Sequence, residues 1–503
     1  MEKSYFKNLI KEKLGNVNLI VVSNREPVAH EYVGKKIKSV KSVGGLTIGI
    51  EPIMKTLNGT WVAYGSGSAD KASSDSSGRI KITSEEENEY YAIKRIFLSK
   101  QEINDYYYGY ANSVLWPLCH IVYVKPVFNS YQFLAYDEVN KKFAAVIKEE
   151  IETLKNNSPE TGEGKPENII WLQDYHLARC AKYLKEYDSK IKVGIFWHIP
   201  WPNPEVFSIC PEKEALLEGL LSNDLIGFHI SYHCQNFLRV CEWELEAQVN
   251  WADYTVTYKG HKTKIMPCPI SVDFQYLQHL ADSEKVENII SDIQNKDEII
   301  EHPYEYLAIS VDRLDYTKGI IEKLKAIDRL LENYSELRGK FVFLQFGVPS
   351  RVHLDAYKRF NDDINSLSEE INWKYGTGDW YPVVRYFKQL DLETYLAYYR
   401  LADLVIVSPL HDGMNLVAKE YISSSANCRG MLVLSRFAGA AKELLDAVLV
   451  NPFNTECFSE SIYKALFMDR DEKVRRMEKM QNIIKENDIY DWAYNFLFAL
   501  NMV

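Results

Sequence analysis

The sequence predicts an α/β protein built from two doubly wound domains, and three observations support this. The chain has 503 residues, and single hydrophobic cores stop growing near ~250–300 residues, so two domains are expected. Short, continuously apolar runs recur along the chain, which is typical of parallel strands covered on both faces. Helical patterns lie between these runs, for example at Glu214–Leu221 and Ile320–Asn333. This alternation indicates a parallel sheet with helices on both sides.

The candidate strands are a few residues long and rich in Val, Ile, Leu or Phe. They lie at Leu19–Ser23, Ile169–Leu172, Val193–Trp197, Leu225–Phe228, Leu307–Ser310, Phe341–Phe346, Leu404–Ser408 and Met431–Leu434. Two prolines within Met266–Asp273 end the preceding element, so we place the boundary between domains 1–270 and 271–484. Asn156–Asn168 is interpreted as a surface loop, and Gly65–Gly78 is a second polar run.

Charge and composition exclude some classes of protein. Apolar residues make up 46% and charged residues 26% of the chain, which is ordinary for a globular protein. The net charge is −11, and this disfavours bulk nucleic-acid binding, which usually needs a basic excess. A small anionic substrate could still be held by a few focused Arg and Lys side chains.

Targeting and redox features point to the cytoplasm. The eight cysteines form no C-x-x-C pair, so we expect scattered buried thiols rather than a disulfide framework or a zinc site. No stretch approaches ~18 uninterrupted apolar residues, and no membrane span or membrane partner is expected. The N-terminus lacks an apolar core of signal-peptide length.

Polar side chains follow several strands of the first half, at the strand ends where ligands bind in doubly wound folds. Arg25 comes directly after the first strand, and its planar fork suits a phosphate, although a salt bridge at the domain edge is an alternative. Asp174 and His198 follow two further strands and could face one cleft, whereas a lone histidine is more often structural. Val43–Leu46 carries paired glycines that favour either close approach to a ligand or an ordinary turn.

An aromatic, polar cluster spans Tyr106–Asn112 and continues to Trp116. Sugar sites use aromatic rings as apolar platforms with a hydrogen-bonding edge. A tyrosine-rich corner of the core would give the same pattern, so both interpretations stay open for this segment alone.

The second half carries cations in its strand-end loops. Arg313 and Lys318 lie five residues apart in a tight turn into a helix, where they could clamp a diphosphate. Arg351 follows the next strand as a third cation. Asp412–Leu416 leads into another helix, whose first amides can bind an anion. Glu420 within that helix could accept both hydroxyls of a ribose, although a surface role is commoner for a single glutamate.

Together these residues resemble the trehalose-6-phosphate synthase family, retaining glycosyltransferases of the two-domain GT-B fold. The resemblance extends from Ser23 to about Pro452, and its motifs occur in the family's order and spacing. They are Ser-Asn-Arg (23–25), Gly-Gly-Leu (44–46), Asn-x-x-Leu-Trp-Pro (112–117), Asp-Tyr-His-Leu (174–177), His-Ile-Pro-Trp-Pro-x-Pro-Glu (198–205), Arg-Leu-Asp-Tyr-x-Lys-Gly (313–319), Asp-Gly-Met-Asn-Leu-Val-Ala-Lys-Glu (412–420) and Phe-Ala-Gly-Ala-Ala-x-Glu-Leu (437–444). The resemblance implies two Rossmann-like domains facing across a cleft, with a C-terminal helix at 485–503 returning to the first domain.

The resemblance also implies roles for individual residues. Arg313 and Lys318 would grip the donor diphosphate, and with His198 and Asp412 they form the expected catalytic group. The implied donor contacts are Gly45, Arg313, Lys318, Leu390, Asp412, Gly413, Met414, Asn415, Leu416 and Glu420. The implied acceptor contacts are Arg25, Tyr107, Trp116, Asp174 and Arg351, with Arg25 and Arg351 at the acceptor phosphate.

Three departures from the family pattern lie on the acceptor side. Ala63 and Tyr64 replace the first Gly and the second Trp of a Trp-x-Gly-Trp-x-Gly stretch. Glu26 follows Arg25 where an apolar residue is common, and the polar run Ser66–Ser77 comes next. These changes put the identity of the acceptor in doubt and leave the donor chemistry untouched.

The expected activity is the retaining transfer of glucose from a nucleotide-glucose, with UDP-glucose favoured, to glucose 6-phosphate, giving α,α-trehalose 6-phosphate. We expect front-face attack, with cations in place of a metal and with no cofactor. The alternatives are glucosylglycerol-phosphate synthesis from glycerol 3-phosphate, and a non-catalytic regulatory relative that would have lost Arg313, Lys318 or Glu420. The partners are small-molecule substrates, and the nucleotide, the acceptor and a homo-oligomeric state remain open.

Overall fold

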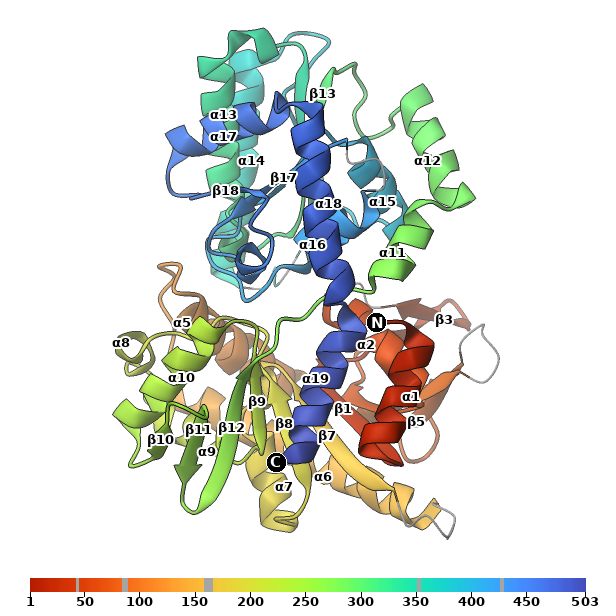
Figure 1. Cartoon of the computed structure of the whole chain (residues 1–503), viewed down its shortest axis with the longest axis vertical. Helices are drawn as coiled ribbons and strands as arrows, with labels where there is room; N and C mark the ends of the chain where they lie inside the picture. Colours follow the sequence, from red (N-terminus) through yellow and green to blue (C-terminus); the bar gives the residue numbers. More distant parts are fainter. Residues whose placement is uncertain (42–44, 84–88, 158–165, 350, 352–353, 426–428) are drawn as a thin grey trace. The chain divides into compact units, whose positions relative to one another are not determined.

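The chain divides into two compact units, each with its own parallel sheet (Figure 1). The first unit comprises Met1–Ile270 together with Ile489–Val503, and the second comprises Ser271–Asp488. The computed structural model describes residues 1–41, 45–83, 89–157, 166–349, 351, 354–425 and 429–503.

The first unit is built on a ten-stranded sheet whose centre is parallel. In spatial order its strands are β10 (Gln248–Asn250), β11 (Thr255–Tyr258), β12 (His261–Pro267), β9 (Leu225–Phe228), β8 (Lys192–Phe196), β7 (Glu167–Gln173), β1 (Val17–Arg25), β4 (Thr60–Tyr64), β6 (Tyr90–Ile96) and β5 (Arg79–Thr83). Only β10–β11, β11–β12 and β5–β6 pair antiparallel among these described strands. Central positions such as Val22, paired with Leu172 and Val62, are fully buried.

Helices form a layer on each face of this sheet. One layer contains α1 (Lys3–Leu14), α2 (Gly45–Leu57) and α19 (Ile489–Met502), which pack against one another. The other contains α4 (Lys100–Glu102), the π-helix Ile103–Leu115, α5 (Trp116–His120), α6 (Ser130–Asn157), α7 (Cys180–Tyr187), α8 (Pro204–Phe207), α9 (Lys213–Leu220) and α10 (Ser231–Glu244). Figure 1 shows α19 beside α1, in front of the central strands.

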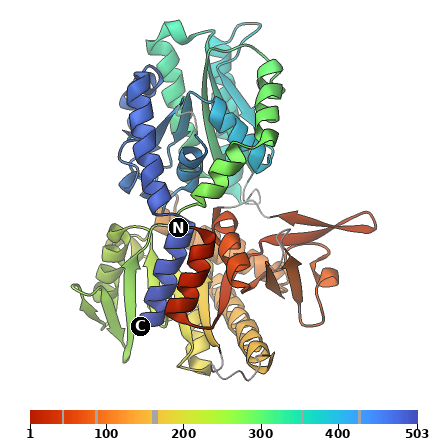
Figure 2. The same ribbon diagram turned by 45° about the vertical axis from the view of Figure 1, so that its right-hand side comes forward.

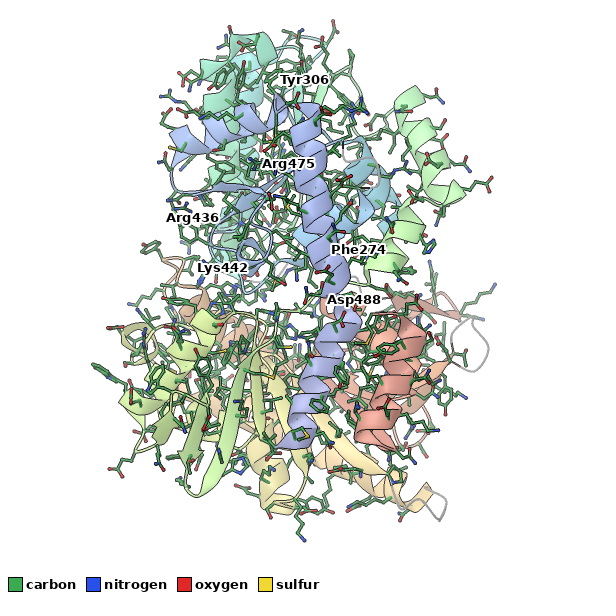
Figure 3. All side chains as sticks on the ribbon, in the orientation of Figure 1. Phe274, Tyr306, Arg436, Lys442, Arg475 and Asp488 are labelled. Atoms are coloured by element: carbon green, nitrogen blue, oxygen red, sulfur yellow. The ribbon has the colours of Figure 1, made fainter. Side chains whose placement is uncertain are left out.

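The C-terminal helix α19 is bound to the first unit by its aromatic side chains. Trp492 lies 4.7 Å from the ring of Trp171 and 5.0 Å from that of Phe196. Asp491 pairs with the N-terminal ammonium of Met1 at 3.1 Å. The preceding helix α18 (Arg470–Glu486) belongs to the second unit, so the return to the first unit begins at Ile489, after Asp488 (Figure 3), where the sequence placed it at residue 485.

The second unit has a six-stranded, wholly parallel sheet. Its spatial order is β15 (Val383–Tyr386), β14 (Phe341–Val348), β13 (Tyr306–Arg313), β16 (Leu404–Val407), β17 (Met431–Ser435) and β18 (Val448–Val450). One helical layer comprises α13 (Ile320–Asn333), α14 (Asp355–Tyr375) and α17 (Thr455–Leu466). The other comprises α11 (Phe274–Ala281), α12 (Glu284–Asn295), α15 (Leu392–Leu401), α16 (Leu416–Ser424) and α18.

The predicted fold class of two doubly wound α/β domains is confirmed in both units. Every candidate strand is present, and the bounds of β9 and α13 match those predicted from the sequence. Of the expected loop at 156–168, residues 158–165 lie outside the described residues, whereas 156–157 end α6 and 167–168 begin β7, so the predicted bounds were too wide. Within the part of the chain that is described, no helix combines the length and the apolar character needed to cross a membrane.

Two features of the first unit were not predicted from the sequence. The segment after Arg25 forms a hairpin of β2 (Val28–Val33) and β3 (Lys36–Lys41), which extends away from the sheet (Figure 2). The polar run at 65–78 contains the short helix α3 (Asp70–Ser73), and Asp70 is fully buried within it. A composition rich in Ser and Gly gave no sign of a buried carboxylate there.

Candidate active site

The candidate residues of the second unit gather at the point where its strand order reverses. Chain order runs outward from β13 through β14 to β15 on one side and from β16 through β17 to β18 on the other. Open doubly wound sheets bind ligands at this switch point, beyond the carboxyl ends of the strands. Arg313 ends β13, and Asp412 follows β16, so both lie at the switch point.

An ion pair closes this strand-end region. The Lys318 ammonium lies 2.5 Å from Oδ2 of Asp412, and both side chains are largely buried. The same carboxylate oxygen accepts a bond of 3.1 Å from Nδ2 of Asn415. Arg313 remains exposed at the end of its strand. Two cations therefore border one strand-end region, one of them fixed by a carboxylate.

Two glycines let the backbone segments around this ion pair approach one another closely. A Cβ on Gly319 would lie 2.2 Å from the Ser408 carbonyl oxygen, and φ at Gly319 is +62°. A Cβ on Gly439 would lie 1.9 Å from the carbonyl oxygen of Gly413. Any side chain at either position would push apart the loops that carry Lys318 and Asp412.

Arg351 takes part in a buried network beneath the Arg313–Lys318 loop. Its NH1 donates to Oδ2 of Asp315 at 3.1 Å and to the Tyr357 hydroxyl at 2.5 Å. Burial opposes ionisation of Asp315, but Arg351 and Arg313 outweigh it and lower the pKa of Asp315 to about 2. The guanidinium of Arg351 is therefore already bound within its own unit, where the sequence predicted only a strand-end cation.

Glu420 has an unusual environment for a carboxylate. It lies half-buried on α16, and burial raises its pKa to about 7. Among the described residues, no side chain donates a hydrogen bond to its carboxylate. A carboxyl group with a raised pKa and no protein partner is a candidate for ligand recognition.

The remaining donor-side candidates lie on the same strand-end loops. Asn415 precedes α16 with φ +78°, and Met414 accepts a backbone bond of 2.9 Å from Ala440. Leu416 begins α16, and Leu390 is half-buried before α15, whose first turn is capped by Asp391. Gly45 begins α2 of the first unit, and its neighbour Gly44 lies outside the described residues.

In the first unit, three candidate residues follow three neighbouring strands. Arg25 ends β1, and Asp174 and His198 follow β7 and β8; the three strands are adjacent in the sheet. Oδ1 of Asp174 accepts a bond of 3.1 Å from the backbone amide of His198. The two residues therefore lie at neighbouring strand ends as expected, but Asp174 contacts the backbone of His198 and not its imidazole.

The His198 imidazole is neutral at physiological pH. Burial lowers its pKa to about 3. Its Nε2 lies 2.8 Å from Oε1 of Gln173, and this contact suits a neutral ring. A group with so low a pKa is a weak base and serves better as a neutral hydrogen-bonding group.

Arg25 and the aromatic candidates form a second group in this unit. NH2 of Arg25 donates to the Tyr107 hydroxyl at 3.1 Å, and the guanidinium lies 5.6 Å from the Tyr107 ring centre. Tyr107 stacks on His176, with ring centres 5.6 Å apart. Trp116 is buried against His120 and Tyr175. The π-helix thus presents Tyr107 to the phosphate-binding candidate Arg25.

Backbone strain coincides with several candidate residues. Eight non-glycine residues of the described chain have positive φ, and Asp174, Arg351 and Asn415 are among them. Such conformations cost roughly 1–3 kcal/mol each and tend to occur at functional sites. In the described residues, no group of three or more His, Cys, Asp or Glu side chains is arranged to hold a metal ion.

Comparison with known proteins identifies relatives across almost the entire chain. The family model described as glycosyltransferase family 20 matches residues 17–502. A bifunctional trehalose-6-phosphate synthase/phosphatase from Thermoproteus tenax is 32% identical over 496 residues, and the match covers 96% of this chain but 63% of that protein. An alpha,alpha-trehalose-phosphate synthase (UDP-forming) 2 from Aspergillus fumigatus is 33% identical over 492 residues, which cover 97% of each chain.

Solved structures are similar over the same length. An E. coli structure described as trehalose-6-phosphate bound with UDP-2-fluoro glucose has a TM-score of 0.81 and 30% identity, covering 97% of this chain and 99% of that one. An alpha,alpha-trehalose-phosphate synthase (UDP-forming) from Burkholderia xenovorans in complex with glucose-6-phosphate has a TM-score of 0.80 and 30% identity, covering 96% and 99%. The resemblance inferred from the motifs is thereby confirmed, and so is the GT-B fold class.

The raised pKa of Glu420 predicts that ionisation of its carboxyl group lowers the free energy of unfolding. Its pKa rises from 4.5 to about 7 on folding, so stability falls as pH increases through this window and the loss is complete above it. Glu420→Gln should therefore increase the free energy of unfolding at pH 8 by about 1–3 kcal/mol, a value reduced by partial solvent access, and change it little below pH 4.5.

Urea unfolding of both proteins at the two pH values measures this effect. Glu478→Gln, an exposed position on α18 of the same unit, serves as the control. No stabilisation of Glu420→Gln at pH 8 would contradict the raised pKa.

Proposed function

Because this chain belongs to glycosyltransferase family 20, we propose that it transfers glucose, with retention of configuration, from UDP-glucose to glucose 6-phosphate, forming α,α-trehalose 6-phosphate. The observation that carries the proposal is the strand-end group of the second unit, where Arg313, Lys318 and Glu420 are all retained. A non-catalytic relative would be expected to lack one of them. The Aspergillus fumigatus and Burkholderia xenovorans relatives are both described as UDP-forming, which supports UDP as the nucleotide.

In this proposal the second unit binds the donor. Arg313 and Lys318 hold the diphosphate by charge-assisted hydrogen bonds. The backbone amides at Gly413–Leu416, which lead into α16, donate further hydrogen bonds to it. The Glu420 carboxylate accepts hydrogen bonds from the ribose hydroxyls. This role fits a carboxylate to which no side chain of the described residues donates. Asp412 contacts the glucose hydroxyls, and the backbone at Leu390 contacts the base.

The first unit, with its C-terminal helix, is proposed to bind the acceptor. Arg25 contacts the acceptor phosphate, and its bond to Tyr107 holds the guanidinium in place. Trp116 and Asp174 contact the acceptor sugar, and His198 lies near the transferred glucose. Gly45 is proposed to approach the donor phosphates. Arg351 is assigned to the acceptor phosphate as well, although its guanidinium is bound to Asp315 in this structure.

The proposed chemistry is front-face attack within the substrates. The anomeric hydroxyl of the acceptor attacks C1 of the donor glucose, the bond from C1 to the diphosphate breaks, and a diphosphate oxygen takes the hydroxyl proton. No protein base is required, and the pKa of His198 near 3 makes that residue unsuitable as one. Arg313 and Lys318 stabilise the charge that develops on the departing diphosphate.

The location of the protein remains a proposal. We assign it to the cytoplasm because none of the seven cysteines of the described chain forms a disulfide, six of them being buried and Cys457 exposed, which fits a reducing compartment.

Removing the Lys318 ammonium should slow the chemical step. Lys318→Ala takes away a cation that binds the diphosphate more strongly as it departs, and kcat should fall by about 10²- to 10³-fold. Steady-state kinetics with saturating UDP-glucose and glucose 6-phosphate measure the change. Lys325→Ala, an exposed position on α13, is the matched control, and equal kcat values for the two folded variants would refute the role of Lys318.

Acceptor identity is tested by direct competition. Glucose 6-phosphate and glycerol 3-phosphate are supplied at equal concentration with UDP-glucose, and both products are quantified. We expect the higher kcat/KM for glucose 6-phosphate, because Tyr107, Trp116 and Asp174 remain available to a hexose ring. A preference for glycerol 3-phosphate would make glucosylglycerol-phosphate synthesis the correct function, and transfer to neither acceptor would contradict the proposal.

A further inference from the structure

A buried group of charged side chains lies next to Arg25 in the first unit. It consists of Glu26, His30, Asp70 and Arg95, whose exposed fractions are 2%, 7%, 0% and 2%. We call this group the Arg95 cluster. The proposed chemistry uses none of these residues, although Glu26 and the run containing Asp70 are departures from the family pattern. Buried charges are costly unless they are paired, so their presence requires an explanation.

The Arg95 guanidinium binds every other member of the cluster. Its Nε donates to Oε2 of Glu26 at 2.7 Å, and its NH2 lies 3.0 Å from Oδ1 of Asp70 and 2.7 Å from Nδ1 of His30. Its other bonds go to oxygens of Val28, Asp70, Ser73 and Ser74 at 2.9–3.1 Å. An arginine with this many partners fixes all the segments that it binds.

The cluster joins the carboxyl ends of three neighbouring strands. Glu26 follows β1, Ser66 follows β4, and Arg95 lies near the end of β6. Oε1 of Glu26 accepts the backbone amide of Ser66 at 2.8 Å, so the glutamate holds the β4 end with one oxygen and β6 with the other. Because β1, β4 and β6 are adjacent in the sheet, Glu26 links their carboxyl ends by side-chain contacts in addition to the backbone pairing.

The backbone at Arg25 is held by contacts of the residues before and after it in the chain. The β1–β4 register shifts between Ser23 and Arg25, which brings Arg25 opposite Tyr64. Such an irregularity redirects a side chain, and Arg25 is the exposed residue of an otherwise buried strand end. The Ser23 hydroxyl donates to the Arg25 carbonyl at 2.7 Å, and Glu26 anchors the next residue. Glu26 therefore holds the backbone from which the Arg25 side chain extends, and Tyr107 orients its guanidinium.

Asp70 secures the turn that follows Tyr64. Its carboxylate accepts the backbone amides of His30 and Gly67 at 2.7 and 2.5 Å. A Cβ on Gly67 would lie 2.4 Å from the His30 carbonyl oxygen, so the turn packs directly against β2. The polar run after Tyr64 is thus held in place through Arg95 and Asp70.

We propose that Glu26 and Arg95 are positioning residues for acceptor recognition, which hold Arg25 and the turn Tyr64–Gly67 in the geometry that binds the acceptor phosphate. The inference rests on the proposed function, in which Arg25 contacts that phosphate. It explains why the departures at Glu26 and in the polar run occur together, since each supplies a partner for the same buried guanidinium.

The cluster also makes acceptor binding depend on pH. Burial and the bond to Asp70 raise the pKa of Glu26 to about 8. Arg95, Asp70 and Tyr64 are the titratable groups that interact with it, and His30 contacts Arg95 and Asp70 within the same cluster. Above this pH Glu26 ionises and loses its hydrogen bond to the buried carboxylate of Asp70. Two negative side chains then share the Arg95 guanidinium, and their repulsion loosens the strand ends that carry Arg25. The KM for glucose 6-phosphate should therefore rise as pH increases from 7 to 9.

Steady-state kinetics of Glu26→Ala on the full chain test the positioning role. The KM for glucose 6-phosphate should rise about tenfold, whereas kcat at saturating acceptor and the KM for UDP-glucose should stay within about twofold. Glu150→Ala is the matched control, because Glu150 is 1% exposed and pairs with Arg79 in the same unit. It should lower stability and leave the acceptor KM unchanged.

Glu26→Gln provides a second variant if Glu26→Ala does not fold. A glutamine side chain cannot ionise, so the acceptor KM of this variant should lack the rise between pH 7 and 9 that the unmodified chain shows. Three results would overturn the inference. The acceptor KM could be unchanged in Glu26→Ala, or it could rise as much in Glu150→Ala as in Glu26→Ala. The third is an acceptor KM of Glu26→Gln that rises between pH 7 and 9 as much as that of the unmodified chain. A failure of the proposed function looks different, because the unmodified chain would then transfer glucose to no sugar phosphate.

Discussion

The ion pair between Lys318 and Asp412 is the interaction on which the second unit's site depends. It joins the loops after β13 and β16 at the point where the strand order reverses, and Gly319 and Gly439 permit the close approach that it needs. Because the net charge of the chain is negative, its overall electrostatic potential does not attract an anion, and the fold must place individual cations at this position. Arg313, bordering the same region, completes a positive pair that is present before any substrate binds. Preorganised charge of this kind costs little reorganisation when a leaving group develops negative charge.

In the first unit a different cation, Arg95, organises the strand ends. Arg95 is buried and neutralised, and its role in our inference is to fix the strand ends that carry Arg25 and Tyr64. Arg25 itself remains exposed and is oriented by Tyr107. In our proposals, Arg25 binds the acceptor phosphate and Arg95 maintains the geometry around it. This division of roles explains, in our inference, why Glu26 departs from the pattern that the family resemblance implies.

Local patterns in the sequence predicted most of the fold, because strands such as β9 and helices such as α13 are continuous apolar or periodic segments. They also placed Arg313 and Asp412 at strand ends. Pairings between distant segments could not be predicted: Lys318 and Asp412 are separated by 94 positions, and the partners of Arg95 come from two distant segments, 26–30 and 70–74. Likewise, the raised pKa of Glu420 arises from tertiary burial. Asp70 gave no signal in a run of Ser and Gly, since only the folded structure brings Arg95 to it.

Charge stabilisation by protein cations, without a divalent metal, is the central claim about the reaction. The most direct measurement is the rate of product formation from UDP-glucose and glucose 6-phosphate by protein that has been treated with excess EDTA and then assayed in metal-free buffer. Arg313 and Lys318 supply the positive charge in our proposal, so the rate should equal that of the untreated protein. A loss of activity on chelation that magnesium or manganese restores would contradict it.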